Sequence, residues 1–159
     1  MNKAHPVEII NVPNTLQNKV SRAHTEEQKF TAANEVIASY SKQFALRLPG
    51  ELSNIEDLHA SLSASPTDED LQKKLFTAVH DLKGQAGTFD YMMITVVGND
   101  LCRFIEHAQS ITPPHLKVML YHIEAMKIIA QKRMTGDEPE GAQRMIDTLH
   151  SMTQKVLQA

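Results

Sequence analysis

The amino-acid sequence predicts an all-α protein: an up-and-down four-helix bundle with an additional N-terminal helix or extended segment. After about residue 27, apolar residues recur at helical spacing almost to the end of the chain. Residues with β-branched side chains are scattered, and aromatic residues make up only 5% of the chain, which speaks against a sheet. The loops between the amphipathic stretches are short, which favours antiparallel neighbours. The 159 residues suffice for one domain with a real core.

Residues 1–27 form a separate N-terminal extension, and we place a helical bundle at residues 28–159. The run HPVEIINVPNTL within this extension contains two prolines and a short β-prone stretch. We therefore expect the extension to be partly extended. Its apolar residues indicate that it lies along the body of the protein.

The first two helices have recognisable boundaries. The first is expected from about Thr25 to Ala64, bent or broken at the LPG stretch, residues 48–50. The second begins at SPTDEDL, where Thr67 is the expected N-cap and three acidic residues occupy the first turn, which the helix dipole favours. This helix extends to about Phe89.

Three further helices follow after short loops. The third spans about Met92 to Gln109. The fourth opens at TPPHL with proline in its first turn and ends near Gly136, which we expect to be its C-terminal cap. The fifth covers about Glu138 to Leu157 and carries one apolar stripe at helical spacing.

The fourth helix is apolar on two opposite sides. Helices that are apolar all round are usually buried on more than one side. We expect the N-terminal segment or the first helix to cover the second side, and the alternative is a contact between two copies of the chain. A monomer is favoured over a homodimer.

The composition limits the cellular compartments and the classes of partner that we expect for this protein. The chain is 42% hydrophobic and 22% charged, with a net charge of −3, which does not favour wholesale binding to nucleic acid. The single cysteine, Cys102, excludes an internal disulfide and fits a reducing compartment. No apolar run approaches the roughly 18 residues of a membrane span, and the N-terminus lacks a signal-peptide pattern. We therefore expect a cytoplasmic protein that does not bind membranes.

The second helix contains an unusual combination of residues, a histidine followed by two glycines. Its expected core stripe lies on one face and consists of Leu71, Leu75, Ala78, Leu82, Ala86 and Phe89. At about 100° per residue, His80 falls almost opposite this stripe, surrounded by Lys73, Phe76, Thr77, Lys83, Gly84 and Gly87. The sequence thus predicts that His80 is exposed.

This combination points to the chemistry of an anion. Each glycine lowers helix stability by about 1 kcal/mol relative to alanine, which makes sense if a bulky partner must approach His80 closely. An exposed imidazole is a competent nucleophile near neutral pH. Lys83, one turn further on, supplies a positive charge within reach of an anion on the ring. A phosphoryl group is the ligand that fits these residues best.

The stretch AVHDLKGQAGTFDY resembles the His-x-x-Lys-Gly-x-x-Gly signature of histidine-containing phosphotransfer (HPt) domains, which are found in bacterial phosphorelays. The resemblance covers roughly residues 30–157, including CRFIE at residues 102–106, which is similar to the pattern of the family's third helix. It implies a four-helix bundle whose phosphoacceptor is exposed midway along one helix.

The resemblance also implies a role for individual residues. His80 matches the phosphorylated histidine, Lys83 the lysine that steadies the phosphoryl group, and Gly84 the glycine that leaves room for the partner's active site. Asp81 and Asp90 depart from the pattern, since small or hydroxylated residues are common at the first position and glycine or another small residue at the second.

Further residues on the same face are candidates for docking a partner. Phe76 is a candidate apolar anchor, and Lys73 together with Lys83 would complement an acidic pocket. The remaining docking candidates are Thr77, Gln85 and Gly87, of which the last two occupy less strictly defined places in the family pattern.

In such domains the partner supplies most of the chemistry. The resemblance implies that response-regulator receiver domains and hybrid histidine kinases are the partners, and that the receiver contributes an aspartate and Mg²⁺. The chain itself would need no cofactor and no metal. It contains no P-loop, Rossmann or histidine-kinase nucleotide motif. We therefore expect a phosphoryl-group carrier, not an enzyme.

Two rival functions are open. The first is a non-catalytic adaptor bundle that binds receivers without carrying phosphate, although such an adaptor would not need His80. The second is a metal- or cofactor-binding bundle enzyme, which would need inward-facing Glu-x-x-His pairs that the sequence lacks.

Other polar residues receive an ordinary structural interpretation. Cys102, Glu106 and His107 match no zinc spacing, so packing is the favoured role of the cysteine. Arg103 falls opposite the apolar stripe of its helix and is expected to be a solvated charge. His115 and His122, seven residues apart on the fourth helix, are expected to be exposed polar positions.

Overall fold

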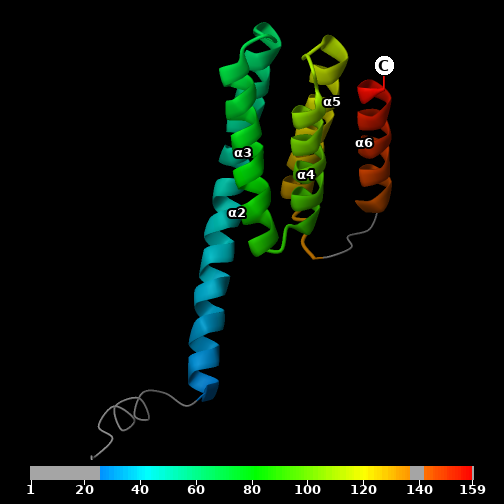
Figure 1. Cartoon of the computed structure of the whole chain (residues 1–159). Coiled ribbons are helices and arrows are strands. Elements are labelled where there is room, and N and C mark those ends of the chain that lie inside the picture. The colour runs from blue at the N-terminus through cyan, green and yellow to red at the C-terminus, as the bar shows by residue number, and fades with distance from the viewer. Residues whose placement is uncertain (1–25, 137–141, 159) are drawn as a thin grey trace, which may run out of the picture. The chain divides into compact units, whose positions relative to one another are not determined.

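A computed structural model describes residues 26–136 and 142–158 of the chain, all helices, turns and bends in those ranges (Figure 1). The chain divides into two units, residues 1–39 and 40–159, and the residues discussed below belong to the second. Within the described part, no helix combines the length and the apolar character needed to cross a bilayer. The predicted extended conformation of residues 1–27 falls almost entirely on residues 1–25, outside the described ranges.

Helix α2, Glu26–Ala64, continues through Pro49, so the break considered at residues 48–50 is absent. An internal proline removes one backbone hydrogen bond and costs a helix about 3 kcal/mol. Leu48 and Leu52 on either side of it are buried almost completely, and burying each leucine contributes about 1.5–3 kcal/mol. Packing of this helix therefore offsets the unfavourable residue.

Helix α3, Glu69–Thr88, begins one residue later than a Thr67 cap requires. The N-cap is Asp68, whose Oδ1 accepts hydrogen bonds from the backbone N–H groups of Asp70 and Leu71, both at 3.0 Å. The prediction that Thr67 is the N-cap is therefore wrong. An ionised carboxylate at this position satisfies two free N–H groups and also interacts favourably with the helix dipole.

The end of α3 explains how an aspartate is accommodated at position 90. Asp90 follows the C-cap Phe89 with a φ of 68°, in the left-handed region. The Tyr91 N–H then donates back to the Ala86 carbonyl at 2.9 Å, as in a Schellman motif. Glycine is preferred at such a position because it has no Cβ, and aspartate is among the few other residues that tolerate it.

Helix α4, Met92–His107, is buried on more than one side and packs against α3, α5 and α6 (Figure 1). The expected stripe of Ile94, Val97, Leu101 and Phe104 is buried. A second set is buried as well: Met93, Gly98, Cys102 and Ile105. The helix therefore occupies the centre of the second unit.

Helix α5, Pro113–Gln131, starts with proline in its first turn, as expected, but ends earlier than predicted. Its C-cap is Lys132, followed by Arg133 with a φ of 49°. The Met134 N–H closes the motif by donating to the Ile129 carbonyl at 3.0 Å. Gly136 is therefore not the cap. It also has a positive φ, 90°, and its N–H donates to the Asp90 carbonyl at 3.0 Å, which links the ends of α3 and α5.

The two apolar sides of α5 are covered by different helices. On one side, α2 contacts α5 through His59, whose Nε2 lies 2.8 Å from the Leu116 carbonyl oxygen, and through Glu56, which accepts from Lys127 Nζ at 2.9 Å. On the other side lies α6, Ala142–Leu157. The two helices line a shared hollow through Tyr121, Ala125, Ile128, Met145, Leu149 and Met152.

The expectation that the first helix covers this second side is therefore corrected, since the last helix packs there. The alternative that the N-terminal segment contributes falls on residues 1–25, outside the described ranges. The expected start of that last helix, at Glu138, lies outside the described residues, which resume with α6 at Ala142. Its stripe supplies one buried leucine, Leu149, and half-buried residues at Met145, Met152 and Val156.

Candidate functional site

His80 projects from the middle of α3 on the side away from the core. Its side chain is 57% exposed, whereas Val79 beside it is fully buried. The Nδ1 atom lies 3.6 Å from Oδ1 of Asp81, so a proton on Nδ1 faces a carboxylate. No described residue hydrogen-bonds to Nε2. Because only Nδ1 has a charged neighbour in the described structure, Nε2 is the nitrogen better placed for a reaction.

Phe76 supports the histidine from one turn earlier in the helix. The two rings stack with their centroids 5.9 Å apart and an interplanar angle of 26°. Phe76 is half-buried against the core, which corrects its placement on the exposed side of the helix. The ring therefore packs against the core and stacks on His80, and its remaining surface lines the hollows between α3 and α4.

Lys83 is directed toward α4. Its Nζ donates to Oδ1 of Asn99 at 3.0 Å, and the side chain is half-buried. A Cβ atom added at Gly98 would lie only 3.0 Å from Cβ of Lys83. Gly98 therefore admits the stem of the lysine, and Asn99 holds its ammonium group. The sequence reasoning missed both residues, because nothing in α4 alone indicates which of its positions faces Lys83.

The two glycines after His80 have different surroundings. A Cβ at Gly84 would meet no atom within 4 Å, and this residue is exposed. A Cβ at Gly87 would lie 3.1 Å from Oγ1 of Thr95. The same Thr95 hydroxyl donates to the Lys83 carbonyl at 2.9 Å. Gly87 therefore allows α3 and α4 to approach each other, and only Gly84 leaves open space beside the histidine.

The other docking candidates lie around this site. Lys73 and Thr77 are exposed. Gln85 is half-buried, and its Oε1 accepts from Nη2 of Arg47 on α2 at 3.5 Å. Among the docking candidates, Gly87 and Gln85 thus make contacts within the protein, whereas Lys73 and Thr77 are accessible to a partner.

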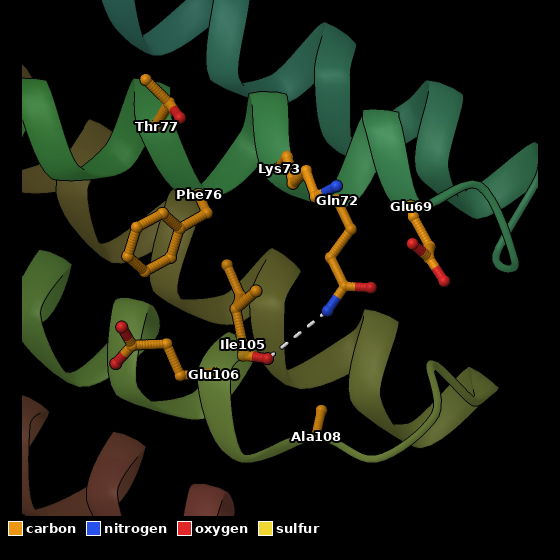
Figure 2. A pocket seen from close by; sticks show the side chains of 8 residues that line it. All are labelled: Glu69, Gln72, Lys73, Phe76, Thr77, Ile105, Glu106 and Ala108. Carbon is orange, nitrogen blue, oxygen red and sulfur yellow. Dashed lines mark hydrogen bonds between the residues drawn. The ribbon is translucent and has the colours of Figure 1, made fainter.

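Two adjoining hollows follow the junction of α3 and α4. The first, of about 320 Å³, is lined by Phe76, Thr77, His80, Lys83, Asn99, Cys102, Arg103 and Glu106. The second, of about 420 Å³, lies toward the start of α3 and shares Phe76, Thr77 and Glu106 with the first. Figure 2 shows the second hollow, with Phe76 facing Ile105 and Glu106 of α4, and with Gln72 donating to the Ile105 carbonyl at 3.5 Å.

Cys102 lies in the first hollow but is not a reactive thiol. Its burial raises the pKa to about 11, and the opposing effect of the Lys83 charge is smaller. The packing role expected for Cys102 agrees with its burial of 98%. In the described part of the chain, no three His, Cys, Asp or Glu side chains are placed to hold a metal ion.

A polar cluster, which we call the Asp100 cluster, joins α4, α5 and α6 through Asp100, His122, His150 and Thr153; His122 and Thr153 are buried, Asp100 is half-buried and His150 is exposed. Asp100 Oδ2 lies 3.0 Å from Nε2 of His122 and 3.3 Å from the Thr153 hydroxyl, which donates to it. His150 Nδ1 lies 3.3 Å from Oδ1 of the same carboxylate. The hydrogen bond with His122 holds the pKa of Asp100 below its usual range.

The expectation that His115 and His122 of α5 are exposed polar positions is wrong. His122 is completely buried, and its Nδ1 faces the Val118 carbonyl at 2.8 Å. His115 is half-buried, stacks on Phe104 and bonds to the Thr112 hydroxyl, and its burial lowers its pKa. Neither is an exposed polar position. The sequence could not show that these rings are covered, because Phe104 and Asp100, against which they lie, belong to another helix.

Comparison of the chain with protein-family models, with curated proteins and with solved structures gives no match. The arrangement around His80 is therefore interpreted from its own geometry.

Proposed function

We propose that this protein is a histidine phosphotransfer protein of a two-component phosphorelay, with the up-and-down four-helix bundle of HPt domains. The observation that carries the proposal is the setting of His80. It is an exposed imidazole with a free Nε2, and Lys83 and the open space at Gly84 lie within one turn of it. The bulk of a partner's active site fits beside such a residue without displacing any side chain.

The proposed reaction is a transfer between an aspartyl phosphate and the histidine. Nε2 of His80 attacks phosphorus, the N–P bond forms, and the bond between phosphorus and the receiver's carboxylate oxygen breaks. The carboxylate leaves as an anion, and the ring proton on Nδ1 can pass to Asp81 or water. In the reverse direction the phosphoryl group returns to an aspartate of a second receiver. The transferred group is stabilised mainly by positioning and charge.

The partners in this proposal are receiver domains of response regulators and of hybrid histidine kinases. The receiver supplies the aspartate and Mg²⁺, so the carrier contributes a positioned imidazole and no cofactor of its own. A cytoplasmic location would follow from the location of such receivers. Lys73 and Thr77 on the exposed part of the α3 face are the residues available for docking.

The direct test is transfer of a labelled phosphoryl group. The full chain is incubated with a radiolabelled phospho-receiver and Mg²⁺, beside His80→Gln as the matched variant. We expect acid-labile, base-stable label on the wild type and none on the variant. Because His80 is exposed, the substitution leaves the core intact, which a circular dichroism melt verifies.

The adaptor hypothesis makes the opposite prediction. If a panel of receivers binds the protein but transfers no label, and binding is equal for His80→Gln, then the protein is a receiver-binding bundle and the phosphotransfer proposal is wrong.

A further inference from the structure

We propose that Arg103 of α4 provides a second cation for the phosphoryl group on His80, so that two helices share the anion site. The inference rests on the proposed function, and it adds a phosphoryl-binding residue outside the motif on α3. Arg103 and His80 line the same hollow, together with Lys83 and Asn99.

The side chain of Arg103 is free to take this role. It is exposed, and none of the described residues forms an ion pair or hydrogen bond with its guanidinium group. Apart from the hydrogen bonds of the helix itself, its backbone carbonyl accepts from Nδ1 of His107 at 2.7 Å, a contact that does not involve the guanidinium group. Arg103 therefore has no described partner that would give its guanidinium group a structural role.

The lysine alone leaves the charge of a phosphoryl group incompletely matched. Such a group carries about two negative charges near neutral pH, whereas Lys83 brings one positive charge and already donates one of its three N–H bonds to Asn99. The planar guanidinium of an arginine can donate two parallel hydrogen bonds to phosphate oxygens. Arg103 would add a second positive charge beside the group.

Two carboxylates near the site make the second cation more important. Asp81 lies beside His80, with its Oδ1 atom 3.6 Å from Nδ1. Glu106 lines the same hollow, at the side shared with the neighbouring one (Figure 2). Both carboxylates repel an incoming anion. Lys83 alone leaves the site with a net negative charge, whereas Lys83 and Arg103 together offset the two carboxylates.

The test uses a small phosphoryl donor, so that docking of a receiver plays no part. Phosphoramidate is incubated with the full chain, and phosphohistidine is followed by phosphorus NMR. Nε2 of His80 attacks phosphorus, the P–N bond of the donor breaks, and ammonia leaves. The variants are Arg103→Gln, Arg103→Lys and, as a matched control, Arg144→Gln on the exposed surface of α6.

We expect Arg103→Gln to slow formation of phosphohistidine about fivefold, the size expected for one partly exposed charge interaction. Arg103→Lys should recover part of the rate, and Arg144→Gln should match the wild type. The difference between wild type and Arg103→Gln should shrink at high salt, because screening weakens exposed charge pairs. A purely structural role would not produce this salt dependence.

The outcomes separate the two proposals. Equal rates for wild type and Arg103→Gln, with His80 phosphorylated in both, would overturn the role of Arg103 and leave the proposed function standing. Absence of phosphohistidine from the wild type, with both the small donor and phospho-receivers, would overturn the proposed function and this inference with it.

Discussion

At the scale of single residues, the glycines of α3 and α4 illustrate how one residue type serves different purposes. Gly84 has open space around its missing side chain, whereas Gly98 is buried and faces Cβ of Lys83. Gly87 faces the Thr95 hydroxyl. Gly84 thus leaves open space on the surface of α3, whereas Gly87 of α3 and Gly98 of α4 allow the two helices to approach each other closely.

We predict that Gly84→Ala and Gly98→Ala change stability in opposite directions. Gly84→Ala should raise the free energy of unfolding by about 1 kcal/mol through helix propensity. In Gly98→Ala, the new methyl group would press on Cβ of Lys83, which the α3 backbone fixes. Overpacking costs about 1–3 kcal/mol, so the net effect should be a loss of up to about 2 kcal/mol. Urea unfolding of both variants measures the difference, and stabilisation by both would refute this view of the α3–α4 contact.

At the scale of the elements, α4 is the helix on which the unit depends. It packs against α3, α5 and α6, and it carries Asn99 toward the site on one side and Asp100 toward α5 and α6 on the other. Neighbouring residues in the sequence thus serve the candidate site and the attachment of the last helix.

We predict that Asp100→Asn lowers the free energy of unfolding by about 2 kcal/mol near neutral pH, because the charge-assisted bond with the buried His122 is lost. The folded-state pKa of Asp100 lies below its ordinary value of 3.8. The ionised carboxylate therefore stabilises the folded protein above pH 3.8, and this contribution disappears as the pH falls through the lowered folded-state pKa. Denaturant unfolding at a series of pH values should show wild type and variant converging in acid.

Asp57→Asn, at an exposed position of α2, is the matched control and should leave stability nearly unchanged throughout the pH range. A constant difference between wild type and Asp100→Asn down to the most acidic conditions would show that the ionised carboxylate of Asp100 is not what stabilises the cluster.

At the scale of the whole molecule, the candidate site occupies only the α3–α4 face of the second unit. No contact joins α3 to α6 in the described structure. The candidate site therefore lies on one face of the unit, and α6 packs elsewhere, against α4 and α5.

We predict that Gly84→Tyr blocks transfer from a phospho-receiver but permits phosphorylation by phosphoramidate. The added side chain has room on the surface of the free protein, yet it fills the space that a docking partner needs. Transfer should fall at least about tenfold, as a loss of 1.4 kcal/mol implies. Ser151→Tyr, at an exposed position of α6, controls for surface bulk. Unimpaired transfer to Gly84→Tyr would contradict the assignment of Gly84 as clearance for a partner.

The amino-acid sequence by itself determined the helical class, the positions of most helices and the outward direction of His80. These properties follow from local periodicity, since residues three and four apart share a face whatever the helix packs against. Four local details were nevertheless misassigned: the N-cap Asp68, the end of α5 at Lys132, continuity through Pro49 and the half-buried position of Phe76. Several neighbouring residues are chemically able to be the N-cap, so the sequence does not single out Asp68. A helix that is packed in the core can contain a proline that would break an isolated helix.

Only the tertiary structure decided which residues meet across helices. It places Asn99 and Arg103 beside Lys83 and His80. It shows that Gly87, a docking candidate from the sequence, faces Thr95 of the neighbouring helix. It also shows His122 buried against Asp100. These pairs are separated by many residues in the chain, and their approach depends on the distance and rotation between packed helices. Periodicity along one helix contains no information about that rotation, so the second helix of the candidate site could be found only in three dimensions.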